Sequence, residues 1–262
     1  MAYLKIHFES QYLNGNTEVG IILPDRPKNV DSKNFYKSGR RYKVLWLLHG
    51  TFGDYSDWIR KSQIEIYARE KNLIVVMPSG LNANYSNWSS GMMGYSMYDY
   101  ITEELMPLVY SWFPASDKRE DNYICGLSMG GGGALKYAVN HPKLFSAAAI
   151  LSSAPKNIIK TAKNPEFRDA NSIANAGGYE EYVNSEENIW KILGEMKEFS
   201  VLPRLLFICG TKDPIAYERF LIFREYSKSI KLDATFEEAE GMGHEWRLWS
   251  SAMERIFEFF GV

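Results

Sequence analysis

The sequence predicts an α/β fold, in which helices cover both faces of a mostly parallel, twisted sheet of about eight strands that starts with an antiparallel hairpin. Segments that alternate polar and apolar residues, or that are continuously apolar, recur along the chain and are typical of strands. Segments of helical period separate most of them, which implies parallel strands joined by helices. The 262 residues suffice for one large domain, and we expect a single domain over 1–262.

The individual elements follow from local patterns. Asn14-Gly15 predicts the tight turn of the hairpin, and the continuous apolar run at 43–48 predicts a strand buried on both faces. The polar segment 155–202 interrupts the alternation and lacks an apolar core, so we expect an insertion or lid over the carboxyl edge of the sheet. The expected strands are 3–9, 17–23, 43–48, 73–78, 122–126, 147–152, 204–209 and 234–239. The expected helices are 57–71, 97–112, up to about 140 after the glycine-rich turn, 180–197, from Pro214 onward, and 245–260.

The composition argues against partners that need a strong surface charge or a lipid phase. The formal net charge is −2, so the chain lacks an electrostatic footprint for nucleic acid or an anionic membrane. The N-terminal residues lack the apolar run of a signal peptide, and no stretch is apolar for long enough to span a bilayer. We expect a cytoplasmic protein without nucleic-acid or membrane partners, and homo-oligomerisation stays open.

The glycine-rich turn at 126–133 carries the strongest chemical signal. Gly126, Ser128 and Gly130 form a G-x-S-x-G motif between an expected strand and an expected helix. On such a turn a serine holds its Oγ above the sheet, in a strained conformation that needs small neighbours. A dinucleotide-binding G-x-G-x-x-G loop would need glycine at 128 and a carboxylate after the next strand, which ends instead in Ser152-Ser153. The motif therefore predicts a nucleophilic serine in an α/β-hydrolase fold.

A serine hydroxyl needs a base, and the sequence offers four histidines. His7 lies on the peripheral hairpin, and His141 ends the helix that begins beside Ser128. His49 follows the 43–48 strand, on the side expected for the oxyanion loop. His244 lies in a glycine-containing turn after the last strand, where α/β-hydrolases place the base. We therefore predict His244 as the base.

Asp213 is the predicted acid that orients the imidazole. It follows the buried strand 204–209 and precedes His244, which completes the order Ser…Asp…His. An aspartate before Pro214 is also a good helix N-cap, and the two roles are compatible. The competitor, Asp233, precedes the last strand and so lies at the opposite edge of the sheet.

The loop after the 43–48 strand is the expected source of the second oxyanion donor. It reads His49-Gly50-Thr51-Phe52-Gly53. We predict that the backbone N–H groups of Thr51 and Met129 form the oxyanion hole.

The 84–98 segment is too irregular for a helix and unusually aromatic for a solvated loop. Loops after the carboxyl ends of parallel strands surround the ligand crevice, so we predict that it lines the cleft near the nucleophile. Phe52, Trp88 and Tyr95 are the predicted substrate-binding residues, and Met92-Met93 would add thioethers to the same wall. The alternative is that these side chains only pack the loop against the body. Rings and thioethers in the cleft would limit acyl length.

The sequence indicates neither a metal nor a cofactor. It has no H-E-x-x-H motif and no cluster of cysteine and histidine. Cys125 and Cys209 lie in apolar runs and are interpreted as buried small hydrophobic residues.

With these residues placed, the chain resembles the esterase D-like carboxylesterases of the α/β-hydrolase fold, most closely the bacterial tributyrin-esterase type. The stretch GLSMGG alone is shared with formylglutathione hydrolases and feruloyl esterases. The resemblance implies Ser128, Asp213 and His244 as the triad and a preference for small acyl esters. The matching stretches, which cover most of the chain outside 155–202, are LLHGTFGDYSDW, VVMPSG, YDYITEELMPLV, FP…KRED, GLSMGGGGAL, CGTKD and GMGHEW.

The leading hypothesis is a serine carboxylesterase that hydrolyses short-chain acyl esters, with a small-molecule ester as its partner. The alternatives within enzymes are an acetyl or feruloyl esterase that acts on plant polysaccharide esters, and a thioesterase of the formylglutathione type. A catalytically silent binding module on the same fold is the alternative from another class. The complete triad argues against such a module.

Overall fold

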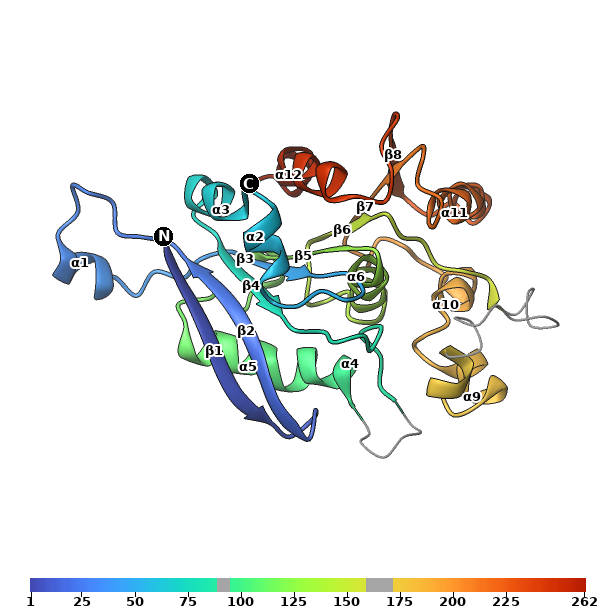
Figure 1. The fold of residues 1–262 in the computed structure, drawn as a ribbon, viewed down its shortest axis with the longest axis horizontal. Coiled ribbons are helices and arrows are strands. Elements are labelled where there is room, and N and C mark those ends of the chain that lie inside the picture. Colours follow the sequence, from blue (N-terminus) through green and yellow to red (C-terminus); the bar gives the residue numbers. More distant parts are fainter. Residues whose placement is uncertain (89–94, 159–171) are drawn as a thin grey trace.

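The computed structural model describes residues 1–88, 95–158 and 172–262, and an eight-stranded sheet of order β1-β2-β4-β3-β5-β6-β7-β8 forms its centre (Figure 1). The strands from β4 to β8 pair in parallel. β1 and β2 form an antiparallel hairpin, and β2 joins the edge of β4 in antiparallel register. All eight predicted strands are confirmed: β1 (Ala2–Ser10), β2 (Gly15–Leu23), β3 (Val44–Leu48), β4 (Ile74–Pro78), β5 (Asn122–Leu127), β6 (Ala147–Leu151), β7 (Arg204–Gly210) and β8 (Ala234–Ala239).

Helices cover both faces of the sheet, as the α/β pattern predicts (Figure 1). One layer contains α2, α3 and α12, and the other contains α4, α5, α6, α10 and α11. The described helices are α1 (Ser32–Tyr36), α2 (Asp57–Lys61), α3 (Ile64–Lys71), α4 (Met97–Asp99), α5 (Met106–Trp112), α6 (Met129–Asn140), α9 (Tyr179–Asn184), α10 (Ile189–Glu195), α11 (Tyr217–Ser229) and α12 (Trp246–Phe260).

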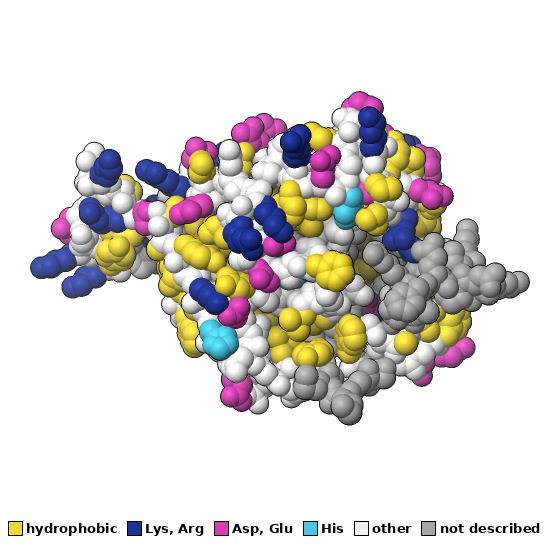
Figure 2. Space-filling view, viewed as in Figure 1, with side chains coloured by type: hydrophobic (Ala, Val, Ile, Leu, Met, Phe, Trp, Pro, Cys, Tyr) yellow, Lys and Arg dark blue, Asp and Glu magenta, His cyan; other side chains and the backbone are white. Residues whose placement is uncertain are grey.

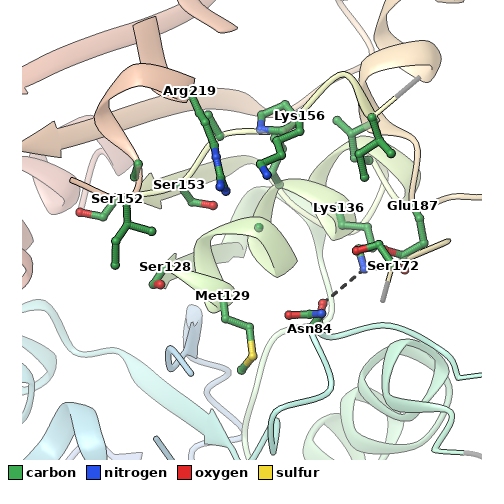
Figure 3. A pocket seen from close by; sticks show the side chains of 18 of the residues that line it. Asn84, Ser128, Met129, Lys136, Ser152, Ser153, Lys156, Ser172, Glu187 and Arg219 are labelled. Carbon is green, nitrogen blue, oxygen red and sulfur yellow. Dashed lines mark hydrogen bonds and ion pairs between the residues drawn. The ribbon is translucent and has the colours of Figure 1, made fainter. Parts of the chain in front are cut away.

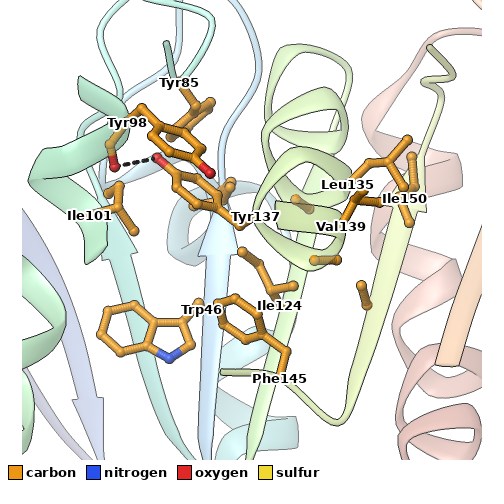
Figure 4. Close-up of a cluster of buried hydrophobic side chains, with 14 of the residues drawn as sticks. Trp46, Tyr85, Tyr98, Ile101, Ile124, Leu135, Tyr137, Val139, Phe145 and Ile150 are labelled. Atoms are coloured by element: carbon orange, nitrogen blue, oxygen red, sulfur yellow. Dashed lines mark hydrogen bonds between the residues drawn. The ribbon is translucent and has the colours of Figure 1, made fainter. Parts of the chain in front are cut away.

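Two buried apolar clusters lie on the two faces of the sheet, and β3 contributes to both. Val44, Trp46 and Leu48 belong to the cluster under α4–α6, whereas Leu45 and Leu47 belong to the cluster under α3 and α12. This alternation is the period of two of a strand whose faces are both covered. Part of the first cluster, between the sheet and α6, is drawn in Figure 4. Helix α6, which follows Ser128, is thus fixed by a large apolar contact.

The helix predicted over 57–71 is two helices, α2 and α3, because Ser62 interrupts it. The backbone of Ser62 is extended, at φ −139° and ψ 178°. Its Oγ donates to the carbonyl of Trp58 at 2.6 Å and accepts the N–H of Ile64 at 3.3 Å. These local hydrogen bonds compete with those of a continuous helix. The short helix α1 was not predicted.

The helix predicted over 180–197 is also divided, into α9 and α10. The side chain of Asn188 accepts a backbone N–H of the first turn of α10 and caps that helix. The predicted helix 97–112 is continuous but contains a π-helical stretch, Tyr100–Leu105. That stretch lies next to Pro107, which has no N–H to donate to an α-helical hydrogen bond.

Side chains of both charges are interspersed over the face drawn in Figure 2, in keeping with a net charge of −2. Within the described ranges, no helix combines the length and the apolar character needed to cross a membrane. Cys125 and Cys209 are buried, as predicted, and neither forms a disulfide.

Candidate active site

Ser128 occupies the tight turn between β5 and α6. Its backbone lies at φ 52° and ψ −118°, a region that costs a non-glycine residue about 1–3 kcal/mol. A Cβ on Gly126 would collide with the carbonyl of Gly130, and a Cβ on Gly130 would lie 2.5 Å from the carbonyl oxygen of His49. The turn therefore needs both glycines of the motif, and it holds Ser128 at the carboxyl edge of the sheet.

The structure brings together the three residues that the sequence places in the triad. His244 lies between β8 and α12, and its Nε2 is 2.9 Å from the Oγ of Ser128. Its Nδ1 is 2.7 Å from Oδ2 of Asp213, which follows β7. A neutral imidazole with its proton on Nδ1 satisfies both contacts, since it donates to the carboxylate and accepts from the serine.

The carboxylate of Asp213 serves two purposes with two different oxygens. Oδ1 accepts the backbone N–H groups of Ile215 and Ala216, both at 2.9 Å, while Oδ2 faces His244. Burial alone would raise the pKa of Asp213, but the hydrogen bonds from His244 and the two N–H groups outweigh it, so the pKa lies below its ordinary value. The carboxylate therefore stays ionised. Helix α11 begins at Tyr217, three residues later than the predicted start.

The other acidic and basic candidates lie elsewhere. Asp233 directly precedes β8, at the opposite end of that strand from His244. His7 lies on the hairpin strand β1, and His141 is the C-cap of α6, where its ring packs against Tyr98.

His49 is close to Ser128, but both of its ring nitrogens have partners. Its Nδ1 lies 2.7 Å from the carbonyl oxygen of Gly50, and its Nε2 accepts the N–H of Gly80 at 2.7 Å. Burial lowers the pKa of His49 and favours the neutral ring, although the Gly50 carbonyl acts in the opposite direction. His49 thus secures the loop that leads to Thr51 and does not face Ser128.

The predicted oxyanion hole consists of the backbone N–H groups of Thr51 and Met129. Both residues line the same cleft as Ser128. Within the part of the chain that the structure describes, neither N–H donates to a protein acceptor, whereas the next amide, that of Phe52, donates to Oδ1 of Asn82 at 2.8 Å. Met129 also opens α6, so the positive end of the helix dipole adds to the field at its N–H. Two unpaired donors beside a serine can stabilise a developing negative charge.

A cleft of about 560 Å³ begins at Ser128 and extends over α6 (Figure 3). Roughly half of its described lining can form hydrogen bonds, a set that comprises Thr51, Asn84, Ser128, Lys136, Ser152, Ser153, Lys156, Ser172, Glu187 and Arg219. The apolar lining includes Met129, Leu135, Ile158, Tyr182, Ile189 and Ile215. The segment predicted as an insertion contributes to one wall through Ser172 and α9–α10.

The structure does not bring the predicted substrate-binding residues into this lining. Trp88 and Tyr95 pack against the core cluster, and Nε1 of Trp88 donates to the carbonyl of Ala83 at 3.0 Å. Phe52 is 92% exposed beside Thr51, with a strained φ of 65°. Packing against the body is the alternative that the sequence left open for the aromatic loop, and Met92-Met93 lie outside the described residues.

Sequence reasoning missed a buried ion pair in the same cleft. Nζ of Lys136 lies 2.5 Å from Oε1 of Glu187, and the two side chains are only 6% and 16% exposed. Nζ also donates to Oγ of Ser86 at 2.6 Å and to the carbonyls of Asn84 and Tyr85. The available signal was a lysine inside the otherwise apolar run of α6, but its partner lies 51 residues away.

A family model described as Esterase matches residues 10–260. The chain belongs to the Esterase family. This esterase is 33% identical, over 272 residues, to an acetyl esterase of Caldicellulosiruptor saccharolyticus, with 99% of the chain and 98% of that relative covered.

Two solved structures resemble this esterase over nearly their whole length. The substrate-bound fluorophosphonate-binding serine hydrolase F of Staphylococcus aureus is 30% identical, with a TM-score of 0.84 and coverage of 99% and 98% of the two chains. The S-formylglutathione hydrolase of Staphylococcus aureus is 29% identical, with a TM-score of 0.78 and the same coverage. This esterase is therefore a serine carboxylesterase with the α/β-hydrolase fold.

Proposed function

We propose that this esterase hydrolyses short-chain carboxylic esters through an acyl-enzyme, with Ser128 as nucleophile, His244 as base and Asp213 as orienting acid. The observation that carries the proposal is the unbroken line of contacts from Ser128 Oγ to His244 Nε2 and from His244 Nδ1 to Asp213 Oδ2, at 2.9 and 2.7 Å. Ser128 also lies at a strained turn, and backbone strain of this kind is typical of functional sites.

In the first half of the reaction, Oγ of Ser128 attacks the ester carbonyl while Nε2 of His244 takes the hydroxyl proton. The ionised Asp213 stabilises the imidazolium that forms. His244 then gives its proton to the leaving alcohol, the carbon–oxygen bond breaks, and the acyl group stays on Ser128. In the second half, water repeats these steps and releases the acid and free Ser128.

The N–H groups of Thr51 and Met129 bind the oxyanion in both halves. Neither N–H has an acceptor among the described residues, which supports this role, because a donor that is already paired would have to break a bond as charge develops. One such donor typically contributes about 2.7–4 kcal/mol of transition-state stabilisation. Phe52, exposed next to Thr51, is proposed to contact the alcohol part of the ester at the rim of the cleft.

The cleft supports a short acyl group and a polar substrate. Lys136 lies eight residues after Ser128, about 12 Å along α6 at 1.5 Å per residue. Its ion pair with Glu187 is buried, so a long apolar chain that reached it would meet charge instead of an apolar wall. The polar residues along the cleft favour hydroxyl or carboxylate groups on the rest of the substrate.

A substrate panel tests this proposal. We expect kcat/KM to fall from acetyl and butyryl to octanoyl p-nitrophenyl esters, and acetylated sugars and a glutathione thioester to be cleaved in preference to simple apolar esters of the same acyl group. Preference for dodecanoyl esters of apolar alcohols would contradict the assignment of the cleft.

A further inference from the structure

Three indole rings form a continuous series of edge-to-face contacts that ends on His244. The ring centroids of Trp58 and Trp246 are 5.2 Å apart at 82°, and those of Trp246 and Trp249 are 5.3 Å apart at 82°. The ring of Trp249 lies 5.1 Å from the imidazole of His244, at 87°. Edge-to-face geometry at these distances is the favourable arrangement of aromatic pairs. We call Trp58, Trp246 and Trp249 the indole series.

Hydrogen bonds fix both ends of the indole series. Nε1 of Trp58 donates at 3.0 Å to the carbonyl of Leu48, the last residue of β3 and two residues before Gly50. Nε1 of Trp249 donates at 3.0 Å to Oγ of Ser152, which directly follows β6. Trp58 and Trp249 are 1% and 5% exposed. With buried rings and bonded nitrogens, neither terminal indole can rotate freely.

Ser152 is itself held in an unusual conformation. Its φ is 47°, which is strained for a residue with a side chain, and its N–H donates to the carbonyl of Ile208 at 2.9 Å. The strained backbone aims Oγ at Trp249. Strain of this kind persists only where the surroundings impose it.

The imidazole of His244 needs such a support. It lies in the turn between β8 and α12, and its two nitrogens are fixed by Asp213 and Ser128. Hydrogen bonds at Nδ1 and Nε2 lie on nearly opposite sides of the ring, so the ring can still tilt about the line that joins them. A perpendicular ring in contact with the imidazole restricts that tilt. Trp249 occupies this position.

We propose that Trp249 is a positioning residue for His244, and that the indole series ties the base to β3, the strand that carries the oxyanion loop. The inference rests on the proposed function, because a tilted imidazole matters only if His244 transfers the proton of Ser128. It adds Trp249 and Ser152 to the residues on which the rate depends, although neither touches the reacting atoms.

Steady-state kinetics of Trp249→Leu on p-nitrophenyl acetate test the proposal. Misplacement of a reacting group by about 1 Å costs on the order of 100-fold, so we expect kcat to fall about 10- to 100-fold while KM changes less than about threefold. Trp249→Phe keeps a ring beside the imidazole but loses the bond to Ser152, so it should recover part of the lost rate. Trp112→Leu, at a 63% exposed tryptophan outside the indole series, is the matched control.

A second measurement separates positioning from general loss of structure. The proton between His244 Nδ1 and Asp213 should give a downfield NMR signal in the folded wild-type protein, and we expect that signal to broaden or move in Trp249→Leu but not in Trp112→Leu. Thermal unfolding of both variants checks that they are folded at the assay temperature. A folded Trp249→Leu with wild-type kcat or an unchanged signal would overturn the inference.

The proposal also predicts an effect at Trp58, the member of the indole series farthest from His244. Trp58→Phe loses the bond to Leu48, and we expect its effect on kcat to be non-additive with that of Trp249→Leu, because the two rings act through the same series. Strict additivity would overturn the tie to β3. A different result would contradict the proposed function itself, namely turnover by Ser128→Ala at the wild-type rate.

Discussion

Replacing Asp213 by asparagine perturbs one atom of the site and leaves its shape unchanged. The side-chain orientation is fixed by Oδ1, which accepts two backbone N–H groups at 2.9 Å each. Asparagine can keep these bonds only with its oxygen in the Oδ1 position, which turns its NH₂ group toward Nδ1 of His244. Rotating the amide by 180° would lose both N–H bonds, at about 0.5–1.5 kcal/mol each. We therefore expect the NH₂ group to face His244.

An NH₂ group in that position donates to Nδ1 and so forces the imidazole proton onto Nε2. His244 can then no longer accept the hydroxyl proton of Ser128, whose Oγ lies 2.9 Å from Nε2. The same change lowers kcat about 10⁴-fold in a well-studied serine protease, and we expect a loss of that order here, near 5 kcal/mol of activation free energy at 1.36 kcal/mol per tenfold.

The assay is steady-state hydrolysis of p-nitrophenyl acetate, with Asp233→Asn as the matched control. Asp233→Asn should stay within about twofold of wild type, because that residue lies at the opposite end of β8. Acid unfolding gives an independent check. The pKa of Asp213 is lowered in the folded state, so its ionisation stabilises the fold above the ordinary value of about 4, and the contribution is lost as the pH falls through the lower folded-state value. Asp213→Asn should lack that part of the pH dependence. Wild-type kcat in Asp213→Asn would refute the reasoning.

Three further predictions concern residues around the triad. Lys136→Met should leave Glu187 as an unpaired charge and lower the free energy of unfolding by about 3 kcal/mol, as measured by urea unfolding. The double variant Lys136→Met/Glu187→Gln should lose less stability and should raise the ratio of octanoyl to acetyl kcat/KM in the ester panel. An unchanged ratio would show that the ion pair does not select the acyl group. Trp88→Ala should lower the melting temperature and change kcat/KM by the same factor for all esters, because its ring packs on the core. A change in kcat/KM for one ester only would show that Trp88 contacts the substrate. Since burial lowers the pKa of His49, the neutral ring stabilises the fold above about pH 6.5, and that contribution is lost as the pH falls toward the folded-state pKa. Between pH 7 and 5 the melting temperature should therefore fall less steeply with pH in His49→Gln than in wild type, and equal slopes would contradict this.

The sheet could be predicted from the sequence because buried parallel strands are short, continuous apolar runs, as at 43–48 and 204–209. The tight turn that carries Ser128 could be predicted equally well, since the strain at Ser128 requires glycines at fixed spacings. Helix ends were less accessible: the break at Ser62 depends on where one hydroxyl finds its hydrogen bonds, which composition does not specify. The lining of the cleft was the least accessible part.

Two residues illustrate why the cleft could not be predicted. Trp88 has the chemistry of a binding residue, but the fold turns its ring toward the core. Lys136 stands in an apolar run of α6, but its buried partner Glu187 lies in a segment 51 residues away, so the sequence could not show the ion pair. Both outcomes depend on tertiary contacts, whereas local periodicity reports only on the element to which a residue belongs.

The central claim is that Ser128 is the nucleophile, and Ser128→Ala tests it most directly. The substitution removes Oγ and leaves the backbone of the turn in place, so the variant should be folded, with the melting temperature of wild type to within a few degrees. Loss of the nucleophile in a well-studied serine protease costs about 10⁶-fold in kcat. The measurement is turnover of p-nitrophenyl acetate together with the stoichiometry of fluorophosphonate labelling by intact-mass spectrometry. The account predicts one label per wild-type chain, no label on Ser128→Ala and activity at the level of the uncatalysed reaction; a folded Ser128→Ala that is labelled, or that keeps a tenth of the wild-type rate, would contradict it.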